Sequence, residues 1–180
     1  MKEIEVKAKL KNKDQVIKKL TELGCVFEDT ITQDDVVYAK NTGSLEIFRA
    51  NDVFLRIRVK NGSKNIFTLK KRMKNDLDAL EYETGIDSKE EMEQALFLMG
   101  YQKIVQVIKT RMITHYNGCE ICIDEVEGLG SFIEMEKLSE DGDSEKIQDE
   151  LFAFFMTLGI AEEDRATVGY DILILQSKEK

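Results

Sequence analysis

Charged side chains occupy every second residue in several short stretches of this chain. Glu3, Glu5 and Lys7 alternate with apolar residues near the start, and Glu134 and Glu136 flank a methionine. Successive side chains of a β-strand point to opposite faces, so each stretch predicts a strand with one charged and one apolar face. A sheet with water on its polar side would explain any single stretch of this kind.

The sign of the charge, however, also changes from stretch to stretch. Basic pairs occupy Arg56 and Arg58, Lys70 and Arg72, and Lys109 and Arg111, and a further acidic pair occupies Glu81 and Glu83. A water-facing sheet gives no reason for acids and bases to separate in this way. A pocket that holds carboxylates for a metal ion and cations for a polyanion predicts that separation.

Length and charge narrow the class of protein. The 180 residues suffice for a substantial core, and we expect a single domain over residues 1–180. The formal net charge of −9 argues against general binding to nucleic acid or acidic membrane, which favours a basic surface. No apolar run approaches the ~20 residues that span a bilayer, and the start lacks a signal peptide's apolar segment. We therefore expect a cytoplasmic protein with neither nucleic-acid nor membrane partners.

The cysteines and the single histidine give little support for nucleophilic or zinc chemistry. Three cysteines are an odd number, which suits a reducing compartment and builds no disulfide framework. Cys119 and Cys122 form a C-x-x-C pair, but residues three apart on a strand face opposite sides. The sequence contains no second pair to complete a zinc site. His115 lies at the end of an expected hairpin, where a merely solvated histidine is the simpler interpretation.

The expected elements favour an α+β fold that is rich in antiparallel strands. Asn61-Gly62 and Asn117-Gly118 predict two-residue hairpins, and residues 42–44 predict a turn. Ser88, with Glu91 three residues later, predicts a helix N-terminus. Hydrophobic patterns predict strands at about 2–10, 26–39, 45–50, 53–60, 65–72, 80–87, 101–116, 119–126 and 132–138, and helices at about 13–23, 88–100, 144–158 and 162–176.

A weak internal repeat is visible in the same patterns. Gly24, Gly100 and Gly159 each follow an apolar residue at the end of an expected helix. This recurrence hints at a two-fold duplication of one helix feeding four strands. Eight or so antiparallel strands with few helices favour a barrel.

Several motifs then follow one another over nearly the whole chain. Glu3-Ile4-Glu5-Val6-Lys7 forms an E-x-E-x-K string. It is followed by a paired-arginine strand at Leu55–Arg58, a T-x-K string at Thr68–Lys70, an acidic strand at Glu81–Glu83, a K-x-R string at Lys109–Arg111, and a D-x-V-x-G-L-G-x-F-x-E-x-E block at Asp124–Glu136. In this order the motifs resemble the CYTH superfamily, the triphosphate tunnel metalloenzymes. That group includes class IV adenylyl cyclases, thiamine triphosphatases and inorganic triphosphatases, and the chain length resembles the cyclase branch.

The chain departs from the family pattern at a few positions. Val37 stands where a tyrosine is common, and Gly169 replaces the serine that usually precedes Tyr170. Ile172 replaces an acidic residue two positions after that tyrosine. Some relatives that hydrolyse triphosphates use a tyrosine near the first of these positions to orient water, so Val37 weighs against that mechanism. We expect Tyr38 on the opposite face of its strand.

The resemblance implies a fold and a site. The fold is an eight-stranded antiparallel β-barrel, a triphosphate tunnel flanked by helices, with the charged faces inside and Ile4, Val6, Ile57 and Met135 packed outward. The implied metal is Mg²⁺ or Mn²⁺. Its implied ligands are Glu3, Glu5, Asp124, Glu134 and Glu136, the implied phosphate-binding residues are Lys7, Arg56, Arg58, Lys70, Lys109 and Arg111, and the implied catalytic residues are Lys7, Glu134 and Glu136.

The resemblance also implies an enzyme with a small-molecule substrate: ATP, thiamine triphosphate or inorganic triphosphate. We expect class IV adenylyl cyclase-like chemistry, which converts ATP to cyclic AMP and pyrophosphate. A triphosphatase that hydrolyses the terminal phosphate is the alternative, and a non-catalytic polyphosphate- or nucleotide-binding module is the second. The same residues bind phosphate in each case, so the motifs do not distinguish them. The resemblance allows a homodimer, and it assigns no role to Tyr38, Arg72, Glu81, Glu83, Arg165 or Tyr170.

Overall fold

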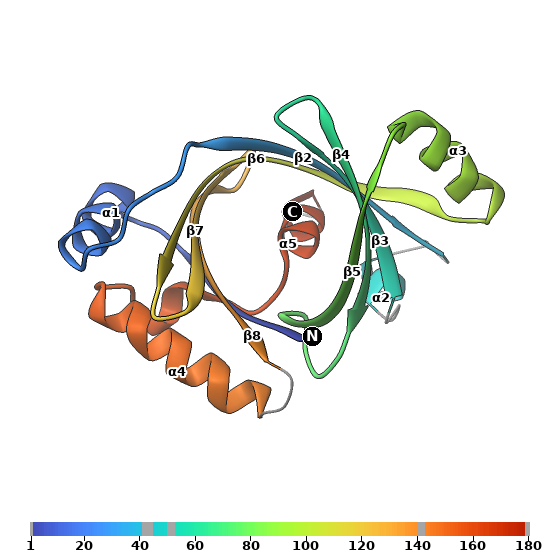
Figure 1. Ribbon diagram of the computed structural model, residues 1–180. Coiled ribbons are helices and arrows are strands. Elements are labelled where there is room, and N and C mark those ends of the chain that lie inside the picture. The colour runs from blue at the N-terminus through green and yellow to red at the C-terminus, as the bar shows by residue number, and fades with distance from the viewer. Residues whose placement is uncertain (1, 41–44, 50–52, 140–142, 179–180) are drawn as a thin grey trace.

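Eight antiparallel strands close into a barrel (Figure 1). The structure is a computed structural model that describes residues 2–40, 45–49, 53–139 and 143–178. The barrel strands are β1 (Lys2–Lys9), β2 (Ile31–Ala39), β3 (Val53–Lys60), β4 (Lys64–Arg72), β5 (Asp78–Ile86), β6 (Gln102–Tyr116), β7 (Cys119–Val126) and β8 (Gly130–Ser139). This architecture confirms the α+β barrel expected from the sequence.

The strand order is two-fold symmetric. It runs β5-β4-β3-β2-β6-β7-β8-β1, and a further pairing of β1 with β5 closes the barrel. If β1–β4 exchange places with β5–β8, the same order results when it is read from the other end, so every strand keeps an equivalent neighbour. Each half has a strand, a helix and three more strands, with α1 (Lys13–Glu22) in the first half and α3 (Lys89–Leu98) in the second; the first half has an additional short helix, α2 (Leu45–Arg49). The topology therefore agrees with the internal repeat suggested by the sequence.

Local sequence signals form the hairpins and the start of α3. Asn61 and Gly62 both have positive φ, 51° and 68°, between β3 and β4. Asn117 and Gly118, at 50° and 76°, have similar φ angles and form the expected two-residue loop between β6 and β7. The pairing of residue 60 with residue 64 makes the β3–β4 loop three residues long, one more than expected. Two successive positive φ angles are the hallmark of the type I′ turn, which Asn-Gly favours. The Ser88 side chain accepts a hydrogen bond from the Glu91 backbone N–H at 3.1 Å, as expected of an N-cap.

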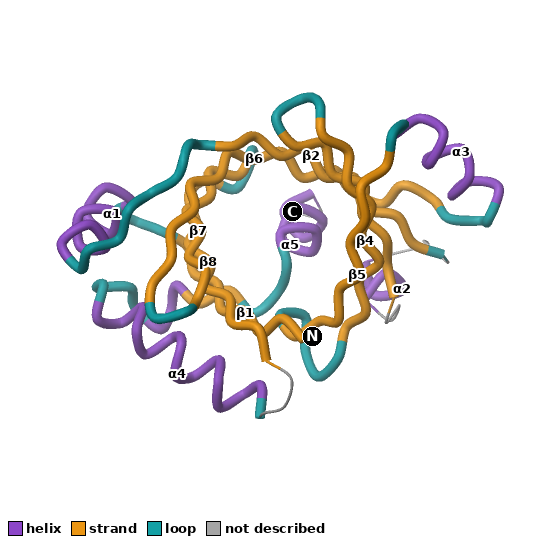
Figure 2. Tube along the Cα trace, in the orientation of Figure 1, coloured by secondary structure: helices purple, strands orange, loops and turns teal. Residues whose placement is uncertain are grey.

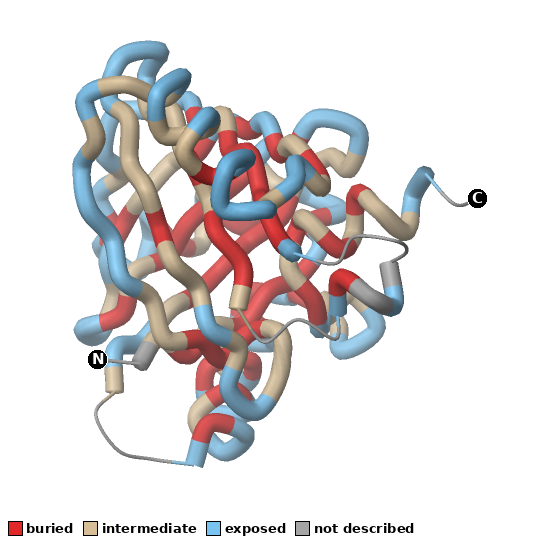
Figure 3. The backbone as a smooth tube through the Cα atoms, turned by 90° about the vertical axis from the view of Figure 1, so that its right-hand side faces the viewer, coloured by how far each residue is buried: buried red, intermediate tan, exposed pale blue. Residues whose placement is uncertain are grey.

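The apolar faces of the strands point outward and are covered by helices. Val6 and Met135 are buried in a cluster with side chains of α1 and α4 (Ser144–Thr157). Ile57 is buried with Leu96 of α3, and Ile4 is fully buried as well. Figure 3 shows the buried segments running through the middle of the molecule, with the exposed segments mainly at its periphery. None of the described helices is long and apolar enough to cross a membrane.

The last helix, α5 (Tyr170–Lys178), lies inside the outline of the barrel (Figures 1 and 2). Ile172 and Ile174 of α5 share an apolar cluster with Val37 of β2 and Val107 of β6. Both valines also line the barrel interior. The helix therefore packs against one part of the inner face of the barrel and makes that part apolar.

Two segments differ from the sequence-based expectation. The expected strand at 45–50 is instead the short helix α2 (Leu45–Arg49), from which Phe48 packs edge-on against Phe54 at 5.9 Å. A strand there would need a free neighbour, but both edges of β2 and of β3 are already paired. The strand expected from residue 26 begins only at Ile31. The expected turn at 42–44 lies outside the described residues.

The expected helix at 162–176 was also wrong in its first half. Glu162–Asp164 forms a 3₁₀ turn, η1, and Arg165–Ala166 forms a short strand, β9, that pairs with β1. β5 pairs with β1 only along residues 2–4, which leaves the edge of β1 at residues 7 and 8 available. Because unpaired backbone groups are costly to bury, β9 fills this edge before α5 begins.

Candidate active site

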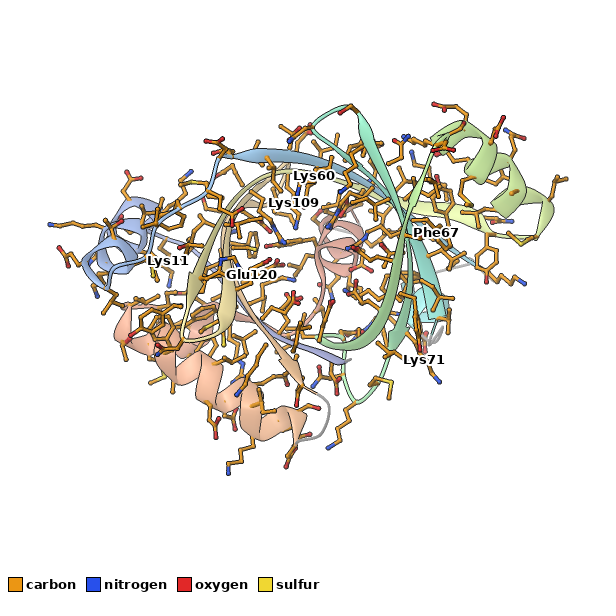
Figure 4. The ribbon with its side chains drawn as sticks, viewed as in Figure 1. Lys11, Lys60, Phe67, Lys71, Lys109 and Glu120 are labelled. Carbon is orange, nitrogen blue, oxygen red and sulfur yellow. The ribbon has the colours of Figure 1, made fainter. Side chains whose placement is uncertain are left out.

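The inward faces of the strands line one cavity of about 330 Å³. In Figure 4, Lys109 and Glu120 lie on the inner side of the barrel wall, whereas Lys11 and Lys71 lie outside it. The cavity confirms the expected convergence of the charged side chains. Its lining includes Glu3, Glu5, Lys7, Arg56, Arg58, Lys70, Lys109, Arg111, Glu134 and Glu136.

Acids outnumber bases in this lining. Ten lining residues carry carboxyl groups, whereas seven are lysine or arginine. Like charges held close together in a partly desolvated space repel one another strongly. The cavity is therefore better suited to a polyanion that binds together with metal cations than to a polyanion alone.

Asp124 sits behind the lining and holds two of the expected phosphate-binding cations. It accepts a hydrogen bond from Lys109 at 2.9 Å and a forked pair from Arg111 at 2.7 and 2.6 Å. The β6–β7 register places Arg111 directly opposite Asp124. Burial alone would raise the pKa of Asp124, but Lys109 and Arg111 hold it below its ordinary value. Asp124 therefore holds the Lys109 and Arg111 side chains in position.

Glu134 links two parts of the same network. It contacts the Arg111 guanidinium and lies 2.8 Å from the Lys7 ammonium, which is also 2.8 Å from Glu5. Burial alone would lower the pKa of Lys7, but Glu134 and Glu5 raise it above its ordinary value. Lys7 is therefore a charged ammonium held at the cavity wall between two carboxylates.

The opposite wall carries a second set of ion pairs. Arg58 donates a fork to Asp35, with both contacts at 2.7 Å. Arg56 donates to Thr68 at 3.1 Å and to Glu83 at 3.0 Å. Burial raises the pKa of Asp35, but Arg58 lowers it to about 2. This wall therefore holds its arginines in fixed positions that face the cavity.

Glu81 neutralises the remaining lysine of that wall. It contacts the Lys70 ammonium, and Arg56 lies 3.4 Å from its other carboxylate oxygen. Burial would raise the pKa of Glu81, but Lys70 and Arg56 lower it to about 2. Glu81 and Glu83, to which the sequence assigned no role, thus serve as partners of the basic pairs on β3 and β4.

Three carboxylates form a different kind of group. Glu5 and Glu136 are direct partners across β1 and β8, and Glu3 lies two residues along from Glu5. Burial and the neighbouring Glu5 raise the pKa of Glu136 to about 7. Burial, Glu81 and Glu136 raise the pKa of Glu3 to about 8. Burial and Glu134 raise the pKa of Glu5 as well. The nearby positive charge is therefore too small to offset the burial and mutual repulsion of these three carboxyl groups.

The donor chemistry of this trio fits a hard divalent cation. Mg²⁺ and Mn²⁺ prefer carboxylate oxygens, and a bound cation would offset the repulsion between Glu3, Glu5 and Glu136. Within the described ranges, no three His, Cys, Asp or Glu side chains are already arranged as a metal cluster. Asp124 and Glu134, the other expected ligands, are engaged by lysine and arginine side chains.

The departures from the family pattern have structural consequences. Val37 lines the cavity, whereas the Tyr38 hydroxyl donates to Glu93 of α3 outside the barrel. A side chain at position 169 would meet only the movable carboxylate of Asp171, and nothing in the structure explains why glycine replaces serine there. Tyr170 lines the cavity.

The cysteines and the histidine behave as the sequence indicated. Cys119 packs in the outer apolar cluster, while the Cys122 thiol faces inward and lies 3.3 Å from Glu120. The two thus lie on opposite faces of β7. The His115 side chain is 60% exposed. Arg165 lies at the surface beside Asp149, away from the cavity lining.

Sequence reasoning missed several residues of the lining, among them Asp35, Glu120 and Tyr170. Glu120 lies four residues before Asp124 on the same face of β7, so the two-residue period could have found it. Asp35 directly follows Asp34, so the spacing of charges could not choose between the two faces of β2. Tyr170 carries no such signal, because α5 enters the barrel through tertiary packing.

Comparisons with known proteins agree with this architecture. The CYTH domain profile matches residues 1–170. The chain is 33% identical over 166 residues to "Putative adenylate cyclase MJ0240" of Methanocaldococcus jannaschii, covering 90% of this chain and 92% of that protein. The structure of PH1819 from Pyrococcus horikoshii OT3 superposes with a TM-score of 0.82 at 28% identity, covering 97% and 99% of the two chains.

A more distant structure shares the fold alone. HpAC1 from Hippeastrum, named for adenylyl cyclase activity and described as having a dominant triphosphatase activity, superposes with a TM-score of 0.60 at 17% identity. The alignment covers 93% of this chain and 90% of that one.

The family profile and the relative from Methanocaldococcus jannaschii both match nearly the whole chain, which folds as a closed barrel with a charged interior. The chain therefore belongs to the CYTH family.

Proposed function

We propose that this chain is a divalent-metal-dependent enzyme that acts on the triphosphate group of a small molecule inside its barrel. The observation that carries the proposal is the pairing of two features in one cavity. Six lysine and arginine side chains of the expected phosphate-binding set line it, and three carboxyl groups with raised pKa values lie beside them. A triphosphate with its metal ion supplies the charges that both groups need.

The arginines are suited to phosphate because their positions are already fixed. Arg58 and Arg111 are held by carboxylate forks, which orient the guanidinium groups before a ligand binds. Lys7 adds an ammonium that remains charged in the buried wall. We assign these residues to binding the phosphate oxygens and to stabilising the charge that develops on them during transfer.

The carboxylates Glu3, Glu5 and Glu136 would hold the cation. Bound Mg²⁺ or Mn²⁺ would supply Lewis acidity to the phosphate oxygens and lower the pKa of the attacking hydroxyl group. Glu134 and Asp124 are engaged by cations in this structure, so we assign them first to orienting Lys7, Lys109 and Arg111. No side-chain nucleophile is required, because such transfers depend on positioning and electrostatics.

We favour a class IV adenylyl cyclase-like reaction. In that reaction the ribose 3′-oxygen of ATP attacks the α-phosphorus, and pyrophosphate leaves. The named function of the relative from Methanocaldococcus jannaschii supports this choice. Val37 also supports it, because an apolar side chain at this point of the lining cannot orient water for hydrolysis.

A triphosphatase is the second candidate, in which water attacks the terminal phosphorus and orthophosphate leaves. The dominant activity described for HpAC1 favours it, since that protein shares the barrel. A module that binds polyphosphate without reaction is the third candidate. It is less well supported, since a binding module has no need for surplus carboxylates next to the phosphate-binding cations.

Product analysis separates these reactions. Purified protein is incubated with ATP or 3′-deoxy-ATP and with Mg²⁺ or Mn²⁺, and the nucleotides, pyrophosphate and orthophosphate are quantified. A cyclase forms cyclic AMP and pyrophosphate from ATP and leaves 3′-deoxy-ATP intact, because that analogue lacks the attacking hydroxyl. Orthophosphate from both nucleotides, without cyclic AMP, would establish the triphosphatase instead. Binding without any product would establish the third candidate.

A further inference from the structure

The hydroxyl group of Tyr170 is buried without a hydrogen-bond partner among the described residues. The residue is 7% exposed, and it lines the cavity from the first turn of α5. A buried hydroxyl that makes no hydrogen bond is destabilising, so such groups are few in folded proteins and call for an explanation. A ligand atom that accepts a hydrogen bond in the occupied cavity would explain this one.

The ring of Tyr170 contacts two of the ammonium groups assigned to phosphate. Lys7 lies 4.1 Å and Lys109 lies 4.8 Å from the ring centroid. Phe132 packs edge-on against the same ring at 5.2 Å and keeps it in place. Lys7 is also paired with Glu134, and Lys109 with Asp124, so the ring lies among charges of both signs. The two ammonium groups are the charges in direct contact with the ring, and they would attract an anionic oxygen to the same place.

We infer that Tyr170 is a substrate-binding residue, whose hydroxyl donates a hydrogen bond to a phosphate oxygen of the bound triphosphate. The same ring holds the Lys7 and Lys109 ammonium groups toward that phosphate. This inference rests on the proposed function for its ligand. The contact comes from α5, which is not one of the barrel strands. The helix would therefore take part in substrate recognition as well as in packing.

Tyr170→Phe isolates the hydroxyl, because phenylalanine keeps the ring that contacts both lysines. In the free protein the substitution removes an unpaired buried polar group, so the thermal midpoint should stay the same or rise. Affinity for triphosphate should fall by about tenfold or more, because a hydrogen bond to a charged oxygen is lost. A residue with a purely structural role would not weaken binding while leaving stability intact.

The probe is the bis-methylene analogue of inorganic triphosphate, which neither reaction cleaves, titrated calorimetrically in MgCl₂. Tyr38→Phe is the matched control, because the Tyr38 hydroxyl is bonded to Glu93 outside the barrel. It should lower the thermal midpoint and leave the affinity unchanged. Tyr170→Leu, which also removes the ring, should weaken binding further than Tyr170→Phe.

The outcomes separate this inference from the proposed function. If the unmodified protein fails to bind the analogue, the proposed function is wrong. If the unmodified protein and Tyr170→Phe bind with equal affinity, the triphosphate site stands and the role of Tyr170 is refuted. A fall in both the affinity and the thermal midpoint of Tyr170→Phe would also contradict the inference, since the hydroxyl would then have a partner within the protein.

Discussion

Glu5 and Glu136 face one another directly across β1 and β8, with both side chains on the inner face of the barrel. Adjacent carboxylates on neighbouring strands repel one another. Glu5 has Lys7 within 2.8 Å, but Glu136 has no ion-pair partner of its own among the described residues. The pair therefore costs stability when both groups are ionised, and this cost should be measurable.

The first prediction concerns pH and metal. The pKa of Glu136 is about 7 and that of Glu3 about 8, both raised above the unfolded value. The folded state therefore binds these protons more tightly, and the free energy of unfolding should fall as the pH rises from 5.5 to 8.5. Urea unfolding in EDTA measures this fall. In MgCl₂ or MnCl₂ the fall should be smaller, because the cation stabilises the ionised carboxylates.

Two carboxylates with lowered pKa values, Asp35 and Glu81, do not contribute to this change in stability. The pKa values of Asp35 and Glu81 lie near 2, below the unfolded value, so their contribution is lost only at acidic pH. A free energy of unfolding that rises between pH 5.5 and 8.5, or that responds to metal equally at both pH values, would show that Glu3 and Glu136 do not form the cation site.

A second prediction concerns Glu136→Gln. The substitution removes a repelling charge, so the metal-free protein should be at least as stable at pH 8 as the unmodified chain. Turnover should fall at least about 100-fold, because even residues that only support metal ligands contribute 10- to 100-fold. Thermal unfolding and steady-state kinetics measure the two effects. Glu127→Gln, at an exposed turn position, is the charge-matched control and should change neither. Undiminished turnover in Glu136→Gln would remove this residue from the mechanism.

A third prediction concerns the buried pair of Asp35 and Arg58. Asp35→Asn leaves the arginine without its carboxylate fork and should lower the free energy of unfolding by about 3 kcal/mol. Asp34→Asn alters the neighbouring residue, which accepts a hydrogen bond from Gln106 at 2.7 Å on the other face of β2. That control should cost only about 1 kcal/mol. Urea unfolding measures the free energy of unfolding of both variants. An equal decrease in the two would contradict the assignment.

A fourth prediction concerns Arg111. Arg111→Lys keeps the positive charge but loses the fork to Asp124 and the contact with Glu134. The fall in kcat/KM for the triphosphate substrate should be at least about tenfold, because a lysine cannot reproduce the planar contacts. Lys71→Arg, outside the barrel, is the reciprocal control and should have no effect. Equal kinetics for Arg111→Lys and the unmodified chain would mean that charge alone matters at this position.

The two-residue period of charge predicted most of the barrel lining. Glu3, Glu5 and Lys7, for example, could be assigned to one face because strand geometry leaves no alternative once the strand is recognised. The hairpins at Asn61-Gly62 and Asn117-Gly118 were predictable for a similar local reason, the positive φ angles of the turn.

Contacts between distant segments were not predictable from local patterns. Nothing in the sequence around Arg165 indicates that it fills the open edge of β1, because that edge exists only after β5 has paired. The entry of Tyr170 into the cavity likewise depends on how α5 packs inside the barrel. The ion pairs of Asp124 were not predictable either. The sequence grouped Asp124 with the expected metal ligands, whereas the β6–β7 register places it opposite Arg111.

Crystallography with manganese tests the central claim most directly. Crystals grown with MnCl₂ and the bis-methylene analogue of ATP would be measured at the manganese absorption edge. The proposal predicts an anomalous peak within coordinating distance of Glu136 and of Glu3 or Glu5, with the phosphates against Lys7, Arg58 and Arg111. Manganese and analogue bound on the outer surface, with the cavity containing only water, would contradict it.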